Sequence, residues 1–198
     1  MHHDGRQVEF DFDPRQFFKN PAAQPRHVGP LQKAAMHSHE YLIREFYAAF
    51  AQRDAAGMAR CYHPDIAFSD PVFPMLRGAE ATAMWAMLTS RAKGDFEIIL
   101  VDASADSESG TARWDAKYTF TQTGRLVHNR IEAVYAFRDG KIVRHVDRFS
   151  FWRWSRQAMG PLGLLLGWSL PLKAMVRRKA RASLAGFMAR GDYLKAGA

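Results

Sequence analysis

Apolar residues in the first half of the sequence recur at intervals of three and four positions, which is the period of an amphipathic helix. The pattern predicts three helices, one that starts near His37, a short one capped by Asp54, and one over Ala79–Ala92. Between the second and the third helix, Ile66–Asp70 is predicted to form a short strand. The strand ends at Pro71, which cannot donate a hydrogen bond to a sheet.

The second half of the chain changes to alternating apolar and polar residues, which is typical of strands with one buried face. Four strands are predicted, over Phe96–Ala103, Thr111–Gln122, Leu126–Phe137 and Lys141–Trp152. Thr123-Gly124 and Asp139-Gly140 are hairpin signals, so the last three strands form an antiparallel meander. This order predicts an α+β fold with helices packed on one side of a curved sheet. The absence of βαβ alternation and of a Gly-rich phosphate loop argues against a Rossmann fold or a nucleotide hydrolase.

The domain of residues 37–152 is flanked by a proline-interrupted N-terminal arm, residues 1–36, and by a C-terminal tail, residues 153–198. The net charge is +8, but residues 152–198 hold nine Lys or Arg and one acid, so this segment accounts for all of it. The rest of the chain is neutral overall. This distribution argues against a basic nucleic-acid-binding body, and we expect no nucleic-acid partner.

The sequence also bears on the compartment. Cys61 is the only cysteine, which excludes a disulfide framework and is compatible with a reducing cytoplasm. No apolar stretch follows the first residues, so no signal peptide is predicted. The longest apolar run, Ala158–Leu172, covers 15 residues and is broken by glycine and proline. Because a membrane span needs about 20 residues, we expect a cytoplasmic protein without one.

Several segments follow one another in an order that is typical of one superfamily. They are Leu42–Asp54, Met58–Tyr62, Pro64–Pro71, Arg77-Gly78, Ala133–Phe137 and Arg138–Ile142. In this order the chain resembles the nuclear-transport-factor-2-like (NTF2-like) superfamily, which includes ketosteroid isomerases and SnoaL-like polyketide cyclases, over about residues 38–152. The resemblance implies a cone-shaped, curved antiparallel sheet wrapped by N-terminal helices around a blind apolar cavity, and a homodimer. Because this fold hosts many activities, it does not by itself define the function.

The resemblance carries over to particular residues. It places the general base of the ketosteroid isomerases at Asp70 and one tyrosine of their hydrogen-bond network at Tyr62. Their two oxyanion donors fall on Phe46 and Ala133, neither of which can donate a hydrogen bond. Loss of one such donor typically lowers the rate by a factor of about 10²–10³. The sequence therefore argues against a standard ketosteroid isomerase, while Asp70 remains a candidate base for related chemistry.

Further candidate residues follow from the alternation of side chains along the last strands. We predict Asp70, His145 and Asp147 as catalytic residues, with Asp70 as base, His145 as acid or stabiliser of negative charge, and Asp147 orienting the imidazole. The predicted substrate-binding residues are Tyr47, Tyr62, Trp85, Asn129, Tyr135 and Phe149. Two alternatives stay open. Asp70 could simply cap the turn at Pro71, or His145 and Asp147 could form a structural pair, which a one-residue slip in register would move to the outer face.

The tail has two interpretations. Residues Lys173–Arg190 place apolar residues on one side and cations largely on the other, which predicts an amphipathic helix. This helix either packs back on the domain, as a lid over the cavity or a cover for a dimer face, or residues 158–190 make a peripheral contact with a membrane. In the second case tryptophans and leucines enter the headgroup layer and cations meet anionic lipid.

Three hypotheses of function result. The first is a small-molecule enzyme, namely an isomerase, cyclase, hydratase or hydrolase that acts on a hydrophobic, carbonyl-bearing substrate through a carboxylate base. The second is a non-catalytic binding protein for an apolar small molecule. The third is a membrane-peripheral or scaffold protein that acts through the tail. No HExxH motif or paired Cys and His pattern occurs, so we expect neither a metal nor another cofactor.

Overall fold

The computed structural model describes residues 37–92 and 94–191, so the predicted N-terminal arm lies outside the described residues. The helices in this part of the chain are α2 (Ser38–Ala51), α3 (Ala55–Cys61), α4 (Ala79–Arg91), α5 (Phe151–Met159), α6 (Pro161–Leu166) and α7 (Leu170–Ala189). The strands are β1 (Tyr62–Ser69), β2 (Leu76–Arg77), β3 (Glu97–Ala105), β4 (Ser109–Phe120), β5 (Arg125–Arg138) and β6 (Lys141–Arg148). The predicted α+β class is confirmed.

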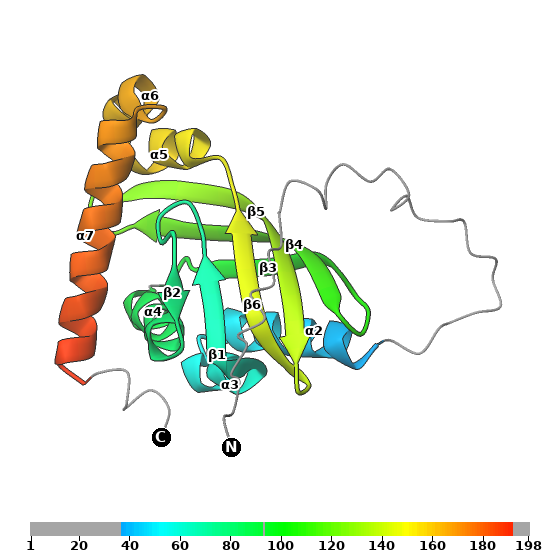
Figure 1. Cartoon of the computed structure of the whole chain (residues 1–198). Helices are drawn as coiled ribbons and strands as arrows, with labels where there is room; N and C mark the ends of the chain where they lie inside the picture. The colour runs from blue at the N-terminus through cyan, green and yellow to red at the C-terminus, as the bar shows by residue number, and fades with distance from the viewer. Residues whose placement is uncertain (1–36, 93, 192–198) are drawn as a thin grey trace, which may run out of the picture. The chain divides into compact units, whose positions relative to one another are not determined.

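The strands form one curved, unclosed sheet in the order β2-β1-β6-β5-β4-β3 (Figure 1). Strands β3 to β6 are the predicted antiparallel meander, and β1 pairs with β6 in parallel. The register shifts between Leu100 and Asp102 in β3 and between Ala136 and Phe137 in β5. An extra residue on one strand bends it and increases the local twist, so these bulges help to curve the sheet.

The N-terminal helices pack on the inner face of this sheet. The side chain of Asp54 accepts a hydrogen bond of 2.8 Å from Gly57 N–H, which confirms it as the cap of α3. Phe46 of α2 is fully buried. Its ring centroid lies 5.2 Å from that of Tyr62 and 5.5 Å from those of both Trp85 and His145. A tightly packed aromatic cluster therefore fills the end of the fold beneath α2.

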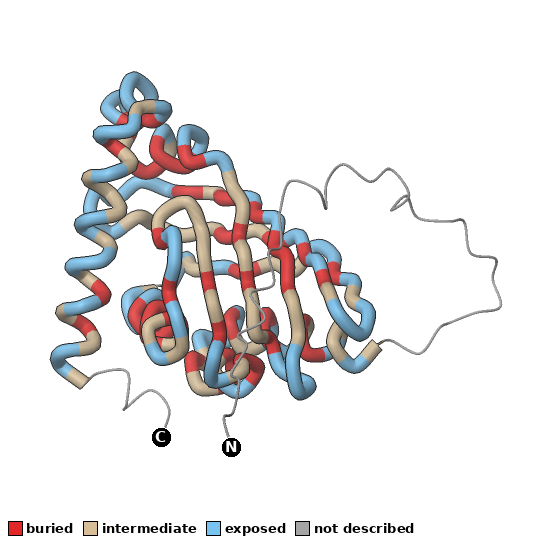
Figure 2. Tube along the Cα trace, in the orientation of Figure 1, coloured by how far each residue is buried: buried red, intermediate tan, exposed pale blue. Residues whose placement is uncertain are grey.

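The last strand is shorter than predicted. It ends at Arg148 rather than at Trp152, and α5 begins at Phe151. The cause is Ser150, whose hydroxyl accepts a hydrogen bond from Arg153 N–H at the start of the helix. As predicted, buried residues alternate with more exposed ones over Gly110–Ala116 in β4 and Val127–Ala133 in β5 (Figure 2), whereas Val134 and Tyr135 are buried next to Ala133.

The C-terminal tail packs on its own domain, as one of the two interpretations predicted. Arg177 of α7 donates to the carbonyl of Pro71, and Arg181 donates to the carbonyl of Met75 and forms an ion pair with Glu80 of α4. Arg91 at the end of α4 donates to Ser183 of α7. None of the described helices has the length and apolar character needed to cross a membrane.

Candidate functional site

A cavity of about 350 Å³ lies between the inner face of the sheet and the helices α4, α5 and α7. Most of its lining is aromatic or aliphatic, and includes Phe50, Phe68, Met84, Trp114, Ile131 and Trp154. The exposed residues that line it, and so mark its mouth, are Leu88, Arg91, Asp95, Thr121, Gln122, Thr123 and Lys179. An apolar pocket with a few polar groups is the usual form of a small-molecule site, for which volumes of about 300–1,000 Å³ are typical.

Asp70 is the first of two carboxylates in this cavity. It follows β1, and its Oδ1 accepts hydrogen bonds from the backbone N–H groups of Val72, at 2.7 Å, and Phe73. Burial raises the pKa of Asp70 to about 7, and the negative charge of Asp147 adds to the rise. These two hydrogen bonds and the Arg177 cation act in the opposite direction and lower the pKa. Asp70 therefore exists both as acid and as carboxylate near neutral pH.

Asp147 is the second carboxylate, and it comes from the inner face of β6. Its Oδ1 lies 3.0 Å from Nε2 of His145 and accepts a hydrogen bond of 3.3 Å from the indole N–H of Trp114. Only 4% of Asp147 is exposed. Two donors hold one oxygen of this carboxylate, and both come from aromatic side chains that pack tightly around it. Its position and orientation are therefore set by the core.

Behind Asp147, a chain of hydrogen bonds runs through the aromatic cluster. The indole N–H of Trp85 donates to Tyr62 Oη at 2.8 Å, and Tyr62 Oη lies 2.6 Å from Nδ1 of His145. Every group is satisfied when the Tyr62 hydroxyl donates to Nδ1 and the ring donates from Nε2 to Asp147. Burial raises the pKa of Tyr62 well above its usual range, which keeps the hydroxyl protonated as a donor. Each donor in this series of hydrogen bonds therefore points toward Asp147.

Two further polar groups in the cavity have hydrogen-bonding capacity left for a ligand. The hydroxyl of Tyr118 accepts a bond of 2.9 Å from the indole N–H of Trp154, which leaves its own hydrogen free to donate. Burial raises the pKa of Tyr118, with a contribution from Asp70, so the hydroxyl is protonated at neutral pH. Among the described residues, none forms a hydrogen bond with the side-chain amide of Asn129, which also lines the cavity.

The structure separates the predicted site residues into two groups. Those that line the cavity are Asp70, Trp85, Asn129, Asp147 and Phe149. Those that lie behind its wall are Tyr47, Tyr62, Tyr135 and His145. The hydroxyls of Tyr47 and Tyr135 pair with each other at 2.6 Å, in the same layer as His145. All four residues of the second group are on inward faces, but the narrow end of the fold is filled there by Phe46 and its neighbours.

Sequence reasoning did not select Tyr118. The alternation in the second predicted strand places Tyr118 on the inward face with Trp114, and this pattern could have identified it as a cavity residue. Its partner Trp154 comes from α5, a helix that the sequence analysis did not predict, because the last strand was expected to continue to Trp152. The hydrogen bond that orients the tyrosine was therefore not foreseeable.

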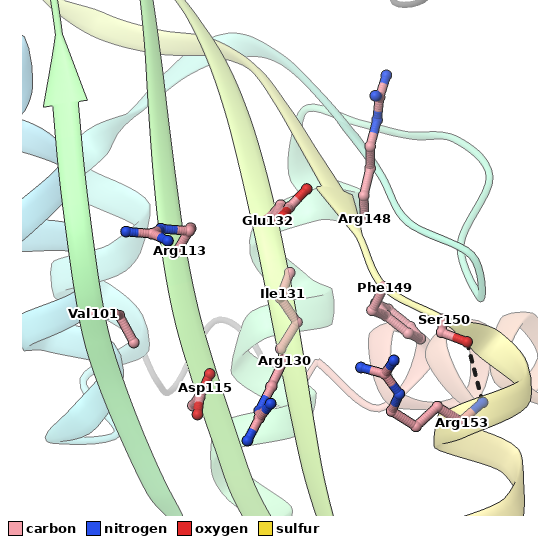
Figure 3. A pocket seen from close by; sticks show the side chains of 10 residues that line it. All are labelled: Val101, Arg113, Asp115, Arg130, Ile131, Glu132, Arg148, Phe149, Ser150 and Arg153. Atoms are coloured by element: carbon pink, nitrogen blue, oxygen red, sulfur yellow. Dashed lines mark hydrogen bonds between the residues drawn. The ribbon is translucent and has the colours of Figure 1, made fainter. Parts of the chain in front are cut away.

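A second depression, of about 630 Å³, lies on the opposite face of the sheet (Figure 3). It is open, and Arg113, Arg130 and Glu132 project into it from β4 and β5. Ile131 and Phe149 line both this depression and the internal cavity. This charged surface lacks the enclosure that a site for an apolar ligand requires. The homodimer implied by the resemblance stays a prediction.

Comparison with known families agrees with this architecture. Residues 43–145 match the family described as the SnoaL-like domain, and the chain belongs to this family. The fold is accordingly NTF2-like, as the sequence resemblance predicted. No curated protein matches the sequence.

Solved structures with the same fold include three informative neighbours. An NTF2-like protein of unknown function from Burkholderia pseudomallei is 18% identical, with a TM-score of 0.55 over 63% of this chain and 100% of its own. AclR, a putative hydroxylase from Streptomyces galilaeus, is 21% identical, with a TM-score of 0.52 over 71% and 99%. An LEH-like epoxide hydrolase of M. tuberculosis is 16% identical, with a TM-score of 0.52 over 65% and 95%. At these identities the likeness establishes the fold alone.

Proposed function

We propose that this protein is a small-molecule enzyme that carries out acid–base chemistry on a hydrophobic, carbonyl-bearing substrate in the internal cavity. One observation carries the proposal: Asp70 and Asp147 line the same apolar cavity, and burial raises the pKa of Asp70 to about 7. A general base is most effective when its pKa lies near the working pH. Titratable groups that are strongly perturbed inside a cavity are typical of catalytic sites.

The proposed step is proton transfer next to a carbonyl group. The Asp70 carboxylate removes a proton from the carbon beside the carbonyl, the C–H bond breaks, and its electron pair moves to the carbonyl oxygen. Tyr118 and Asn129 are the groups with free hydrogens that would donate to this oxygen. Asp70 then returns the proton to carbon. Such donors would take the place of the two that are missing at Phe46 and Ala133.

In this proposal Asp147 acts on Asp70 as well as on the imidazole of His145. It supports the proposal through charge, because its negative charge raises the pKa of Asp70. His145 is fully buried behind it and reaches the cavity only through Asp147. We therefore assign His145 and Tyr62 as positioning residues, and keep Asp70 as the group that contacts substrate.

Hydrogen–deuterium exchange tests this proposal without knowledge of the natural substrate. A panel of hydrophobic ketones is incubated with the protein in D₂O, and deuterium uptake beside the carbonyl is followed by mass spectrometry. We expect Asp70→Asn to lower the catalysed exchange by at least about 10²-fold. Tyr118→Phe should lower it by about 10²-fold or more. The matched control is Asp102→Asn, which removes an exposed carboxylate from β3 that pairs with Arg113 and should leave exchange unchanged.

The outcomes separate the two hypotheses that concern the cavity. Exchange that Asp70→Asn leaves intact removes Asp70 as the base and contradicts the proposal. A ketone that binds the wild-type protein and Asp70→Asn equally, with no exchange in either, identifies a binding protein. The apolar lining of the cavity agrees with both, but two carboxylates in one apolar cavity are unfavourable in a site that only has to bind an apolar ligand.

A further inference from the structure

The apolar surface of the chain is concentrated at one end of the C-terminal tail. Of the twelve large hydrophobic residues that are exposed in the described part of the chain, six lie between positions 162 and 170: Leu162, Leu164, Leu165, Leu166, Trp168 and Leu170. We call the segment Pro161–Leu170 the α6 tip. Figure 1 shows α6 beside α5 at the N-terminal end of α7, and Figure 2 shows most of this segment as exposed.

The exposure of these side chains follows from the way α6 packs. Its inner face consists of Gly163 and Gly167, which are buried against α5. A Cβ at Gly163 would lie 1.9 Å from the carbonyl oxygen of Ser155, and one at Gly167 would lie 2.1 Å from Ser155 Oγ. The indole N–H of Trp152 also donates to the carbonyl of Leu164. Because only glycine fits on the inner face, the leucines point outward from a firmly held support.

The segment that contains the tip carries one sign of charge. Residues 151–191 include eight Lys or Arg and no Asp or Glu. Arg156 lies over the ring of Trp152, with its guanidinium carbon 5.1 Å from the ring centroid, and Lys173 lies over Phe151 at 5.6 Å. Arg156 belongs to α5 and Lys173 to α7, the two helices that adjoin the tip. An apolar projection bordered by cations complements a surface that is apolar inside and negatively charged at its headgroups.

We propose that the α6 tip docks on a lipid surface that contains anionic phospholipid. Leu165, Trp168 and Leu170, which are 68%, 72% and 78% exposed, enter the headgroup layer. Arg156 and Lys173 meet the lipid phosphates. The contact is peripheral, since no described helix is suited to cross a bilayer. Large apolar side chains that are exposed together in one segment typically mark an interaction surface.

Lipid is favoured over a second copy of the chain by shape and charge. The tip is a short projecting helix and not a flat face, and a symmetric contact would bring its cations together with no acid in residues 151–191 to neutralise them. The proposal does not depend on the chemistry in the cavity, because none of the six exposed residues lines it.

Vesicle co-sedimentation with the full chain tests the proposal. Vesicles of phosphatidylcholine alone are compared with vesicles of phosphatidylcholine mixed with phosphatidylglycerol. We expect binding to the mixed vesicles that weakens as salt is added, because the headgroup attraction is screened. The variant L165S/W168S/L170S should lose at least about a hundredfold in the partition coefficient, because three large side chains no longer leave water. The control is Leu126→Ser, which changes an equally exposed leucine, at 74%, on β5.

Two results would overturn the proposal, namely no binding of the wild-type chain to the mixed vesicles, and equal binding by the wild type and the triple variant. If the triple variant in the second case also changes its oligomeric state, a second copy is identified as the occupant. Circular dichroism checks that the triple variant is folded, and Leu165→Ser alone serves as the milder variant. Loss of vesicle binding with unchanged deuterium exchange in the cavity would separate this surface from the proposed catalytic site.

Discussion

The raised pKa of Asp70 has a measurable effect on stability. In the folded protein this pKa rises from its usual value of 3.8 to about 7, and burial of the carboxyl group is the main cause. In the unfolded chain Asp70 loses its proton at the lower value, so between these values the folded state binds more protons than the unfolded state. Stability contributed at this site is therefore fully present below pH 3.8 and lost as pH rises toward 7. Above that range it stays constant at the lower level.

The magnitude follows from the size of the shift. A shift of this size corresponds to ~4 kcal/mol of differential interaction, at about 1.4 kcal/mol for each unit. The Asp70 side chain keeps partial exposure to the cavity, so water reduces this figure and we expect ~2 kcal/mol. Asp70→Asn keeps the acceptor for Val72 and Phe73 and removes the charge. We predict that this variant is more stable than the wild type by ~2 kcal/mol at pH 8, with a much smaller difference at pH 5.

Urea unfolding at both pH values measures the effect, with Asp106→Asn as the matched control. Hydrogen bonds from the backbone N–H groups of Ser109 and Glu108 lower the pKa of Asp106, so its contribution is present above pH 3.8 and is lost only as pH falls further. The control should therefore be less stable than the wild type by the same amount at pH 5 and at pH 8. An Asp70→Asn difference that is also independent of pH in this range would refute the reasoning.

Two further pairs of substitutions test the packing around the cavity and the tip. Tyr62→Phe removes the hydroxyl that links the Trp85 indole to the His145 imidazole in the core, and should destabilise the fold by about 2–4 kcal/mol in thermal unfolding. The control Tyr41→Phe, at an exposed position, should have no effect. Gly163→Ala forces a Cβ against the Ser155 carbonyl and should destabilise the protein by at least about 1–3 kcal/mol. Gly186→Ala, inside α7 with its nearest neighbour at 3.7 Å, should stabilise it by about 0.5–1 kcal/mol. Equal effects of the two glycine substitutions would contradict the close packing of α6 on α5.

The sequence predicted the faces of the strands but not the depth of each residue in the fold. Strict alternation places both His145 and Asp147 on the inner face of β6, and both do lie there. Only Asp147 reaches the cavity, because the ring of Phe46 and its aromatic neighbours fill the space next to His145. That difference depends on how α2 lies across the sheet, and no local pattern encodes it.

Local signals also compete, as the end of β6 shows. Apolar residues continue through Phe151 and Trp152, which predicted a longer strand, but Ser150 supplies a helix cap and the chain turns into α5. The amphipathic pattern of the tail was more reliable. It predicted the buried side of α7, with Leu184 and Phe187 inward, although it could not show which part of the domain they would meet.

The attachment of α7 determines the surroundings of the Asp70 carboxyl group in two ways. Arg177 bonds to the carbonyl of Pro71, the residue that follows Asp70, and its positive charge lowers the pKa of Asp70. The same helix also lines the cavity, through Met175, Val176 and Ala180, so a substitution that loosens α7 changes both the burial of Asp70 and the cation beside it. These two changes have opposite effects, because contact with water lowers the pKa of Asp70 and loss of the cation raises it. Since burial is the larger cause, we expect the pKa to fall.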